Sequence, residues 1–394
     1  MNDFDYLAKD QIYLDSACQS LRPRPVIDAL TDYYTHYNSC GERVKYKWGK
    51  ITDEKVDQTR AQILKYLRLK PRDHIVSFTL NTTYGINLLL DQIRLSFVKK
   101  VVTTDIEHNS PFLSTIAFAR KHTYTGKAKM EREVIDRNPD GSVPLDATDW
   151  TRALLVLNCA SNIDGRELGN VKDLIKTVHK HDGIVIIDAA QAMAHGSSLL
   201  HKTEADAICF SAHKMYAPSL GVIVARRDLL PKIDTTFIDG GMVDDADREA
   251  YTLSATDSSH AHTKFESGLQ AWGEIIALGR AIEWLQDLPS SAHATLKQNT
   301  EALYDFLVNH PKIHLIGSKP SPTMSFHVES LDSHLLGEAL SRESIMARTG
   351  YFCCHYYLDH VKHYPPLVRL SLSYATRASD IAKVISVLSK LLNT

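Results

Sequence analysis

Two side chains that could share one reaction each follow a short apolar run. Asp188 ends the run GIVIID, and Lys214 follows the run DAICF after the short turn Ser211-Ala212-His213. Ligands of open α/β sheets bind outside the carboxyl ends of the strands, so both side chains are expected to face one crevice. Taken singly, each has an ordinary alternative: Asp188 could cap a helix, and Lys214 could be a solvated loop residue.

An acid and an amine at two strand ends form the pair that pyridoxal-phosphate enzymes use. The amine carries the cofactor as a Schiff base, and the acid faces the nitrogen of its pyridine ring. The pair is more informative than either member. We therefore predict a pyridoxal 5'-phosphate site with Lys214 in the first role and Asp188 in the second.

The phosphate of such a cofactor needs hydrogen-bond donors, and a helix N-terminus supplies them. The turn Asn81-Thr82-Thr83-Tyr84-Gly85 offers capping side chains between a predicted strand and a predicted helix. His108, which follows Asp105-Ile106-Glu107 at another strand end, has a flat imidazole ring that could stack on the cofactor ring. Each signal is weak alone, because the turn could be a plain helix cap and His108 an ordinary loop residue.

The elements expected to position these residues alternate along the chain. Apolar, β-branched runs bounded by turns predict strands, and amphipathic stretches between them predict helices. The expected strands are 74–79, 100–104, 154–158, 183–188, 206–210 and 221–225, with helices at 84–94 and 171–181. This alternation predicts an α/β fold with a mainly parallel sheet that is covered on both faces.

The C-terminal part of the chain has a different pattern. Residues 242–262 are polar and are expected to form a long surface excursion or mobile loop, followed by a helix over 266–288. Strands at 321–328 and 367–373 then mix with further helices. We expect a large cofactor-binding domain at 22–265 and a smaller α+β C-terminal domain at 266–394, with residues 1–21 packed on one of them.

Composition argues against several other classes of protein. The 394 residues carry a formal net charge of −2, which gives no reason to expect nucleic-acid or anionic-membrane binding. There is no HExxH or paired CxxC pattern to predict a metal site. The N-terminus lacks the pattern of a signal peptide, no apolar run is long enough to span a membrane, and the six cysteines are scattered. We expect a cytoplasmic enzyme with reduced thiols.

The order of the motifs resembles one enzyme family. Along the chain come NTTYGIN, EHN, SNIDG, DAAQ, SAHK, FESG, RTGYFC and VRLS. This order resembles class V (fold type I) pyridoxal-phosphate enzymes, and within them the group II cysteine desulfurase and selenocysteine lyase family. The match runs from Ile12–Ala17 to Tyr374–Thr376, which is nearly the whole chain. It implies a fold type I aminotransferase-like homodimer whose large domain holds a mainly parallel sheet of the seven-stranded type.

The resemblance also implies a role for each residue of the site. Lys214 would bear the cofactor and move protons at the substrate, and Asp188 would keep the ring nitrogen protonated. His108 would stack on the ring and serve as a catalytic residue in acid–base steps. Arg369, in LVRLSLS, would grip the substrate carboxylate with its planar guanidinium. Asn162 and Gln191 would contact the ring's phenolic oxygen, with Asn162 also near the substrate. The implied phosphate ligands are Thr82, Thr83, Ser211 and His213.

Cys353 stands where desulfurases of this family carry their nucleophile. The resemblance implies that its thiolate takes the sulfur of L-cysteine, releases L-alanine and passes the resulting persulfide to an acceptor protein or small thiol. From the residues alone, the favoured interpretation is that Cys353 and Cys354 are two small hydrophobic side chains at a domain edge, and it is the family spacing of Arg348-Thr349-Gly350 that favours a catalytic Cys353. The alternatives are then a C–S lyase, selenocysteine lyase, epimerase or aminotransferase of class V without a catalytic cysteine, or a non-catalytic scaffold.

Three positions depart from the family pattern. Leu269 stands where a threonine contacts phosphate across the dimer, which leaves that contact in question. Tyr351 and Phe352 replace the paired histidines that commonly precede the cysteine. This replacement weakens any inference about whether the enzyme prefers a sulfur or a selenium substrate. Asp164 occupies a place that is usually small or apolar.

Overall fold

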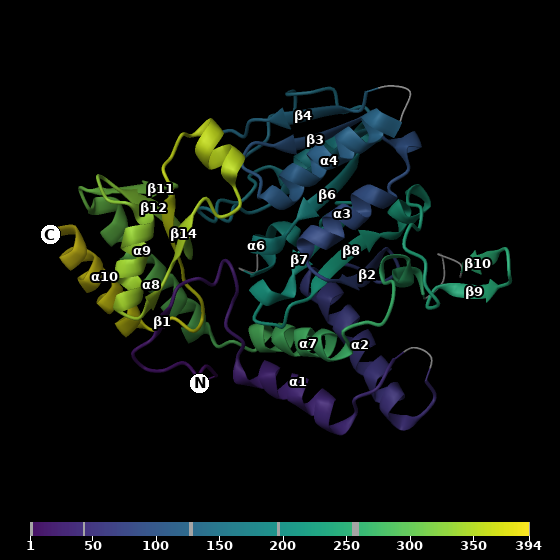
Figure 1. The fold of residues 1–394 in the computed structure, drawn as a ribbon, viewed down its shortest axis with the longest axis horizontal. Coiled ribbons are helices and arrows are strands. Elements are labelled where there is room, and N and C mark those ends of the chain that lie inside the picture. Colours follow the sequence, from purple (N-terminus) through teal and green to yellow (C-terminus); the bar gives the residue numbers. More distant parts are fainter. Residues whose placement is uncertain (1–2, 42–43, 126–128, 195–197, 254–259, 394) are drawn as a thin grey trace.

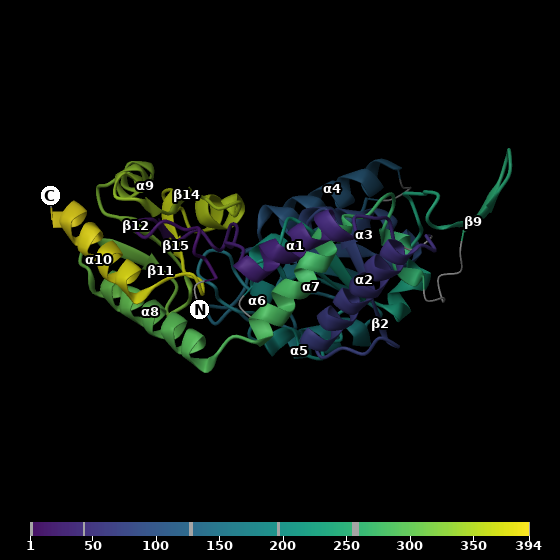
Figure 2. The ribbon, with the colours of Figure 1, turned by 90° about the horizontal axis from the view of Figure 1, so that it is seen from below.

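The computed structural model describes the whole chain except residues 1–2, 42–43, 126–128, 195–197, 254–259 and 394. It has two lobes, a larger one built on a wide sheet and a smaller one that carries the C-terminus (Figure 1). Figure 2, viewed from below, shows the same two lobes side by side, with the N-terminal segment running between them.

The large lobe is built on a seven-stranded sheet with the order β2-β8-β7-β6-β5-β3-β4. Its strands are β2 (His74–Thr79), β3 (Lys100–Thr104), β4 (Glu131–Ile135), β5 (Ala153–Asn158), β6 (Ile184–Asp188), β7 (Ala207–Ser211) and β8 (Gly221–Arg226). Only β8 runs antiparallel to its neighbours β2 and β7; the neighbouring pairs from β7 to β4 are parallel. The predicted mainly parallel sheet is confirmed.

Helices cover both faces of this sheet because its strands are apolar on both sides. Along β6, Ile184 and Ile186 enter one hydrophobic core and Val185 and Ile187 enter the other. The first core is closed by α3 (Thr82–Gln92) and α4 (Asn109–Thr125). The second is closed by α1 (Arg24–His36), α2 (Lys47–Tyr66), α5 (Val171–Lys180), α6 (Ala190–Ala194) and α7 (Trp272–Gln286).

The small lobe has a four-stranded antiparallel sheet in the order β11-β12-β15-β14. Its elements are α8 (Ser290–Asn309), β11 (Ile313–Ile316), β12 (Thr323–Val328), α9 (Ser333–Arg342), β14 (Arg348–Gly350), the π-helix η6 (Tyr356–Val361), β15 (Leu367–Ser371) and α10 (Ala378–Asn393). The N-terminal strand β1 (Ile12–Tyr13) pairs with β13 (Ile345–Met346), and Leu14 is buried in the small-lobe core. The segment before α1 therefore packs on the small lobe around Ile12–Leu14, whereas Phe4 and Ser20 on either side contact the large lobe.

Helix α7 starts later than predicted and belongs to the large lobe. The expected helix over 266–288 begins only at Trp272, because Gly268 has a φ of +81° and cannot lie in a right-handed helix. Ile275 and Leu278 of α7 lie in the core shared with α1 and α2, whereas α8 packs in the small lobe. The predicted boundary at 265/266 would separate α7 from its own core, so we place the division between α7 and α8.

Part of the polar stretch at 242–262 forms regular structure. Strands β9 (Val243–Ala246) and β10 (Tyr251–Leu253) make an antiparallel hairpin that projects from the large lobe (Figures 1 and 2). The rest of this stretch includes residues 254–259, which lie outside the described residues. The chain re-enters the lobe through the short helix η5 (Ala261–Phe265); the other 3-10 segments are η1 (Leu95–Phe97), η2 (Ser198–Leu200), η3 (Ala212–Lys214) and η4 (Arg227–Lys232).

Candidate active site

A cavity of about 310 Å³ lies at the carboxyl ends of β5, β6 and β7, where the small lobe meets the large one. All eleven site residues predicted from the sequence line it: Thr82, Thr83, His108, Asn162, Asp188, Gln191, Ser211, His213, Lys214, Cys353 and Arg369. They come from segments that are far apart in the chain. As expected for ligand sites of open α/β sheets, the carboxyl ends of neighbouring strands meet at this cavity.

Asp188 and Lys214 face this cavity from neighbouring strands. Asp188 is the last residue of β6, and its Oδ1 accepts a hydrogen bond of 2.9 Å from the backbone N–H of Ala190. Burial raises the pKa of Asp188. The hydrogen bond from the Ala190 N–H and the positive charge of Lys214 oppose that rise. Burial also lowers the pKa of Lys214, against the attraction of Asp188. A lysine with a lowered pKa is more often an uncharged, nucleophilic amine.

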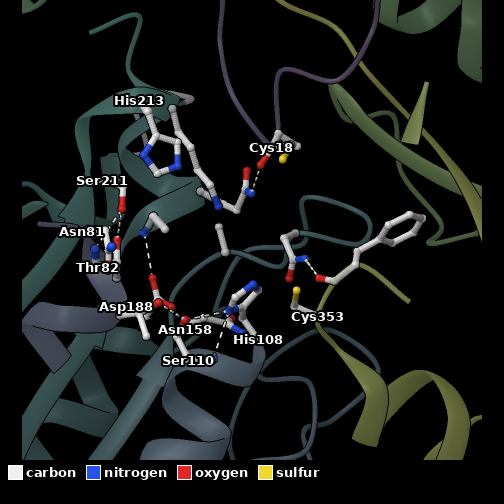
Figure 3. Close-up of a pocket in the computed structure, with 18 of the residues that line it drawn as sticks. Cys18, Asn81, Thr82, His108, Ser110, Asn158, Asp188, Ser211, His213 and Cys353 are labelled. Atoms are coloured by element: carbon white, nitrogen blue, oxygen red, sulfur yellow. Dashed lines mark hydrogen bonds between the residues drawn. The ribbon is translucent and has the colours of Figure 1, made fainter. Parts of the chain in front are cut away.

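A cluster of hydroxyl groups lies at the N-terminus of α3. Asn81 caps this helix, because its Oδ1 accepts from the N–H of Tyr84 at 2.9 Å. The Oγ of Ser211 accepts from the N–H of Thr82 at 2.9 Å and lies 2.6 Å from the Thr82 hydroxyl. A helix N-terminus with free donors attracts anions. The cluster has the composition of a phosphate site, and Figure 3 shows it on the side of the cavity opposite Cys353.

Close approach of the backbone shapes this corner. A Cβ placed on Gly221, the first residue of β8, would lie 2.5 Å from the backbone nitrogen of Asn81. No side chain fits at that distance, so glycine is required for the capping turn to sit against β8. The position of the turn is therefore determined by its packing against the sheet as well as by its own sequence.

His108 is held in one orientation by a residue that the sequence analysis missed. Its Nδ1 accepts from the backbone N–H of Ser110 at 3.0 Å and lies 3.0 Å from the Ser110 hydroxyl, which in turn contacts the Thr83 hydroxyl at 2.6 Å. Burial, together with the charges of Lys214 and Arg369, lowers the pKa of His108 to about 3. The ring is therefore neutral, with its proton on Nε2.

Two buried amide oxygens at the cavity have no hydrogen-bond partner among the described residues. Gln191 donates from Nε2 to the carbonyl of Ala17 at 2.8 Å, and its Oε1 is unpaired. Asn158 donates to the carbonyl of Ile106 at 3.1 Å, and its Oδ1 is likewise unpaired. Buried polar atoms are nearly always satisfied, so these oxygens favour a polar molecule in the cavity.

An ion pair supports the cavity from behind. Arg137 donates to the Glu107 carboxylate at 2.8 Å and to the Asn158 carbonyl at 2.7 Å, while Glu107 accepts from the Asn158 N–H at 2.6 Å. Both charged side chains are almost fully buried. Burial raises the pKa of Glu107 to about 7, although Arg137 opposes the rise. The network fixes the end of β5. There Asn158 lies opposite Asp188 of the neighbouring strand β6.

Arg369 reaches the cavity from β15 of the small lobe. One guanidinium nitrogen donates to the carbonyl of Asn162 at 3.0 Å, and another donates to the Asp15 carboxylate at 3.1 Å. Its Nε is buried and has no partner among the described residues. The predicted anion-binding arginine is thus oriented by the N-terminal segment and by a loop of the large lobe.

The two adjacent cysteines have opposite environments. The side chain of Cys353 is exposed and lines the cavity, on a loop of the small lobe (Figure 3). Cys354 is buried, and its thiol donates to Oδ1 of Asn162 at 2.9 Å. Burial raises the pKa of Cys354 above the ordinary range of a thiol. Of the pair, Cys353 is the one placed to react.

Four further polar side chains of the lining were not part of the predicted site: Cys18, Ser110, Asn158 and Arg348. Asn158 could have been found, because it ends an apolar strand in the same way as Asp188. Cys18 follows the motif IYLDSA and Arg348 is the first residue of RTG, but nothing in their type or spacing predicts that their side chains point into the cavity. Asp164, noted as a departure from the family, is absent from the lining; it pairs with Arg166 at 2.8 Å.

Comparison with families of known proteins decides the class. The model of the aminotransferase class-V family matches residues 12–384. The chain belongs to this family. A probable cysteine desulfurase of Haemophilus influenzae is 26% identical, with 99% of this chain and 88% of the relative covered. A probable cysteine desulfurase of Pyrococcus abyssi is also 26% identical, covering 95% and 90% of the two chains.

Solved structures show the same fold. The apo cysteine desulfurase of Thermococcus onnurineus superimposes with a TM-score of 0.83 at 24% identity, covering 100% of this chain and 99% of that one. An Escherichia coli cysteine desulfurase with an S-sulfonic acid gives a TM-score of 0.85 at 19% identity, with the same coverage. The class V family member expected from the motifs, with its aminotransferase-like fold, is confirmed.

The described residues include neither a membrane-spanning helix nor a metal-binding cluster. None of their helices is long and apolar enough to cross a membrane. Nor do these residues contain a cluster of three or more histidine, cysteine, aspartate or glutamate side chains that could hold a metal ion.

Proposed function

We propose that this protein is a pyridoxal-phosphate-dependent cysteine desulfurase, which converts L-cysteine to L-alanine and leaves a persulfide on Cys353. One observation carries the proposal. An exposed thiol on a small-lobe loop, Cys353, lines the same cavity as the buried Asp188 and the partly buried Lys214. Its curated relatives in Haemophilus influenzae and Pyrococcus abyssi are named probable cysteine desulfurases, which supports the choice within the class V family.

The residues of the cavity suit pyridoxal phosphate. The hydroxyl groups at the start of α3 would bind the phosphate, Asp188 would face the ring nitrogen, and Lys214 would hold the cofactor covalently. The unpaired oxygens of Gln191 and Asn158 leave acceptors free for a bound polar molecule. A structural neighbour, a lysine-to-alanine variant of C-DES, has glycine covalently linked to its PLP cofactor. When bound, the cofactor withdraws electrons from the substrate α-carbon.

Each protein group then has a defined task. Arg369 would bind the substrate carboxylate, since its buried Nε has no partner within the described part of the chain and its other nitrogens are already oriented. Lys214, with its lowered pKa, would accept the α-proton and return it. Neutral His108 presents Nε2–H as a donor, because Ser110 occupies Nδ1.

The sulfur step involves Cys353 directly. Its thiolate attacks the sulfur of the bound substrate, an S–S bond forms, and the bond between that sulfur and the substrate β-carbon breaks. The electron pair of the broken bond stays with the substrate, which takes up a proton and leaves as L-alanine. The persulfide sulfur then passes to a thiol of an acceptor protein or small molecule.

We propose further that two copies of the chain form a homodimer in the cytoplasm. Leu269 is 76% exposed, and Phe237 and Ile238 are exposed beside it. The hydroxyl of Ser267 donates to the carbonyl of Phe237 at 2.7 Å, which holds the two segments together. An apolar patch of this kind is typical of an interface. All six cysteines are free, which suits a reducing compartment.

The proposal is tested by incubating the purified holoenzyme with L-cysteine and a thiol acceptor, and measuring alanine and sulfide together. Equal amounts of the two are expected. Cys353→Ser should bind the cofactor normally and lose both products, whereas Cys40→Ser, which removes an exposed thiol outside the cavity, should match the wild type. Sulfide with pyruvate in place of alanine, undiminished in Cys353→Ser, would replace the desulfurase with a β-eliminating C–S lyase.

A further inference from the structure

The loop that carries Cys353 has an unfavourable backbone conformation. Phe352 and Cys353 have φ values of +48° and +58°, so two consecutive residues with side chains are left-handed. Such conformations are uncommon outside glycine, and they persist only where the surrounding structure imposes them. The contacts around the loop must therefore hold it in place.

Asn162 of the large lobe holds the loop on both sides of Cys353. Its Nδ2 donates to the carbonyl of Phe352 at 2.8 Å, and its Oδ1 accepts from the thiol of Cys354 at 2.9 Å. Phe352, Cys354 and Asn162 are all buried, so both bonds are largely shielded from bulk solvent. Loss of one partner would leave a buried polar group unpaired, which costs more than the bond itself contributes.

A second asparagine contacts the loop from the start of α4. The backbone N–H of Asn109 donates to the carbonyl of Cys353 at 2.5 Å, and its side-chain Nδ2 lies 3.1 Å from Nδ1 of His355. With the bonds to Asn162, each of the four residues from 352 to 355 is held by the large lobe. The side chain of Cys353 alone is left exposed at the cavity.

The same asparagine is linked to the arginine expected to bind the substrate. The guanidinium of Arg369 donates to the carbonyl of Asn162 at 3.0 Å and lies 4.8 Å from the centre of the Phe352 ring. Asn162 thus contacts the arginine through its backbone and the cysteine loop through its side chain. Asn162 therefore links the position of the Cys353 loop to that of Arg369.

From these contacts we infer that Cys354 is a positioning residue, whose hydrogen bond to Asn162 fixes the loop so that the Cys353 thiol faces the substrate. Cys354 is then an anchor and not a spare nucleophile. Burial raises the pKa of its thiol, so the group stays protonated and donates. The effect on turnover rests on the proposed function, since only a reaction at Cys353 requires that thiol to be positioned.

The test compares Cys354→Ser with Cys354→Ala. The two side chains are similar in size, but only serine keeps a donor for Oδ1 of Asn162, so their difference isolates the hydrogen bond. Amide hydrogen exchange of the holoenzyme, followed on peptic peptides that cover residues 349–362, should be about fivefold faster in Cys354→Ala and within about twofold of wild type in Cys354→Ser. If alanine does not fold, Cys354→Val keeps the buried volume without a donor.

Steady-state kinetics provide the second readout. Cys354→Ala should lower kcat for alanine formation about fivefold with KM for L-cysteine nearly unchanged, and serine should restore kcat. Equal exchange rates in the two variants would overturn the inference. So would faster exchange in Cys354→Ala without loss of kcat, provided that Cys353→Ser is inactive. If Cys353→Ser keeps full sulfide release, the proposed function fails, while the exchange result still reports on the anchor.

Discussion

The backbone N–H of Ser110 donates to Nδ1 of His108 at 3.0 Å, and this bond determines which nitrogen of the ring carries the proton. A neutral imidazole with an occupied Nδ1 presents Nε2–H to the cavity. Because burial and the charges of Lys214 and Arg369 lower its pKa to about 3, His108 stays neutral over the working range of most enzymes.

This shift predicts a pH dependence of stability. A histidine whose folded pKa lies below its unfolded value of 6.5 takes up its proton more readily in the unfolded chain. Its contribution to stability is therefore present above about pH 6.5 and is lost as the pH falls toward 3, by at most about 1.4 kcal/mol per pH unit. Urea unfolding of the apoenzyme at pH 7 and pH 5 should show a smaller acid-induced loss in His108→Asn than in wild type. An equal loss would mean that His108 is protonated in the folded protein.

The covalent attachment of the cofactor gives a second prediction. Borohydride reduction of the holoenzyme should fix pyridoxal phosphate to Lys214, and Lys214→Ala should abolish the linkage, because this amine alone combines a lowered pKa with a place in the cavity among the described residues. Peptide mass spectrometry locates the label. Lys264 serves as an internal control, since it also is buried with a lowered pKa but lies outside the cavity. A label on Lys264 would refute the site.

Replacing Asp188 should separate binding from chemistry. Asp188→Asn keeps an oxygen that can accept from the Ala190 N–H, so the turn after β6 should survive and the cofactor should bind. Loss of the charge at the ring nitrogen should slow exchange of the α-proton of L-alanine by roughly tens-fold or more. Proton NMR in D₂O measures this exchange without any sulfur chemistry. If the variant exchanges the α-proton at the wild-type rate, Asp188 serves only as a helix cap and not in the chemistry.

The sequence predicted six of the seven strands of the large sheet, because their signals are local. Runs such as GIVIID and GVIVA are apolar on both faces, and the structure has strands at 184–188 and 221–226, within a residue of the expected ranges. Strand β4, with the sequence EREVI, was missed because its charged residues suit an exposed edge. The start of α7 was misplaced because the left-handed Gly268 is set by tertiary contacts, including the bond of its N–H to the Asp239 side chain.

The part of the site that lies at the carboxyl ends of the strands was predictable, because these ends meet at one edge of the sheet. Asp188, Lys214 and His108 could be placed in one cavity from their positions after strands and turns. Contacts between lobes could not be foreseen. The bond from Cys354 to Asn162 joins residues almost two hundred positions apart in the chain, and it depends on how a small-lobe loop meets the large lobe. No local pattern carries that information.

The exposed apolar patch at Leu269 predicts an interface between copies. Sedimentation of the wild type should give about twice the chain mass of 44.2 kDa, because Leu269 is 76% exposed beside Phe237 and Ile238. Leu269→Asp should weaken the dimer, since it places a charge in a buried contact. Val308→Asp introduces the same charge at an exposed apolar position on α8 of the small lobe and should have no effect. A wild-type monomer that is fully active would reject the interface.

The buried pair Glu107 and Arg137 supports a final prediction, in which the effect of a mutation depends on pH. Breaking a buried ion pair by removing one partner typically costs about 3–5 kcal/mol, because the remaining charge has lost its compensation. Arg137→Met should therefore destabilise the fold and disturb the Asn158 end of β5, to which Arg137 also donates.

The sign of the pH effect follows from Glu107. Its folded pKa of about 7 lies above its unfolded value of 4.5, so its contribution to stability is full below about pH 4.5 and is lost as the pH rises through 7. Arg137 opposes that rise in pKa, so its removal raises the pKa further and extends the loss to higher pH. Urea unfolding should show a larger penalty for Arg137→Met at pH 8 than at pH 6. The double variant Glu107→Gln/Arg137→Met, which has no charge left to bury, should lose this dependence on pH and regain part of the stability. An equal penalty at both pH values would mean that Glu107 does not titrate in this range and that the pair stabilises the strand end only through its hydrogen bonds.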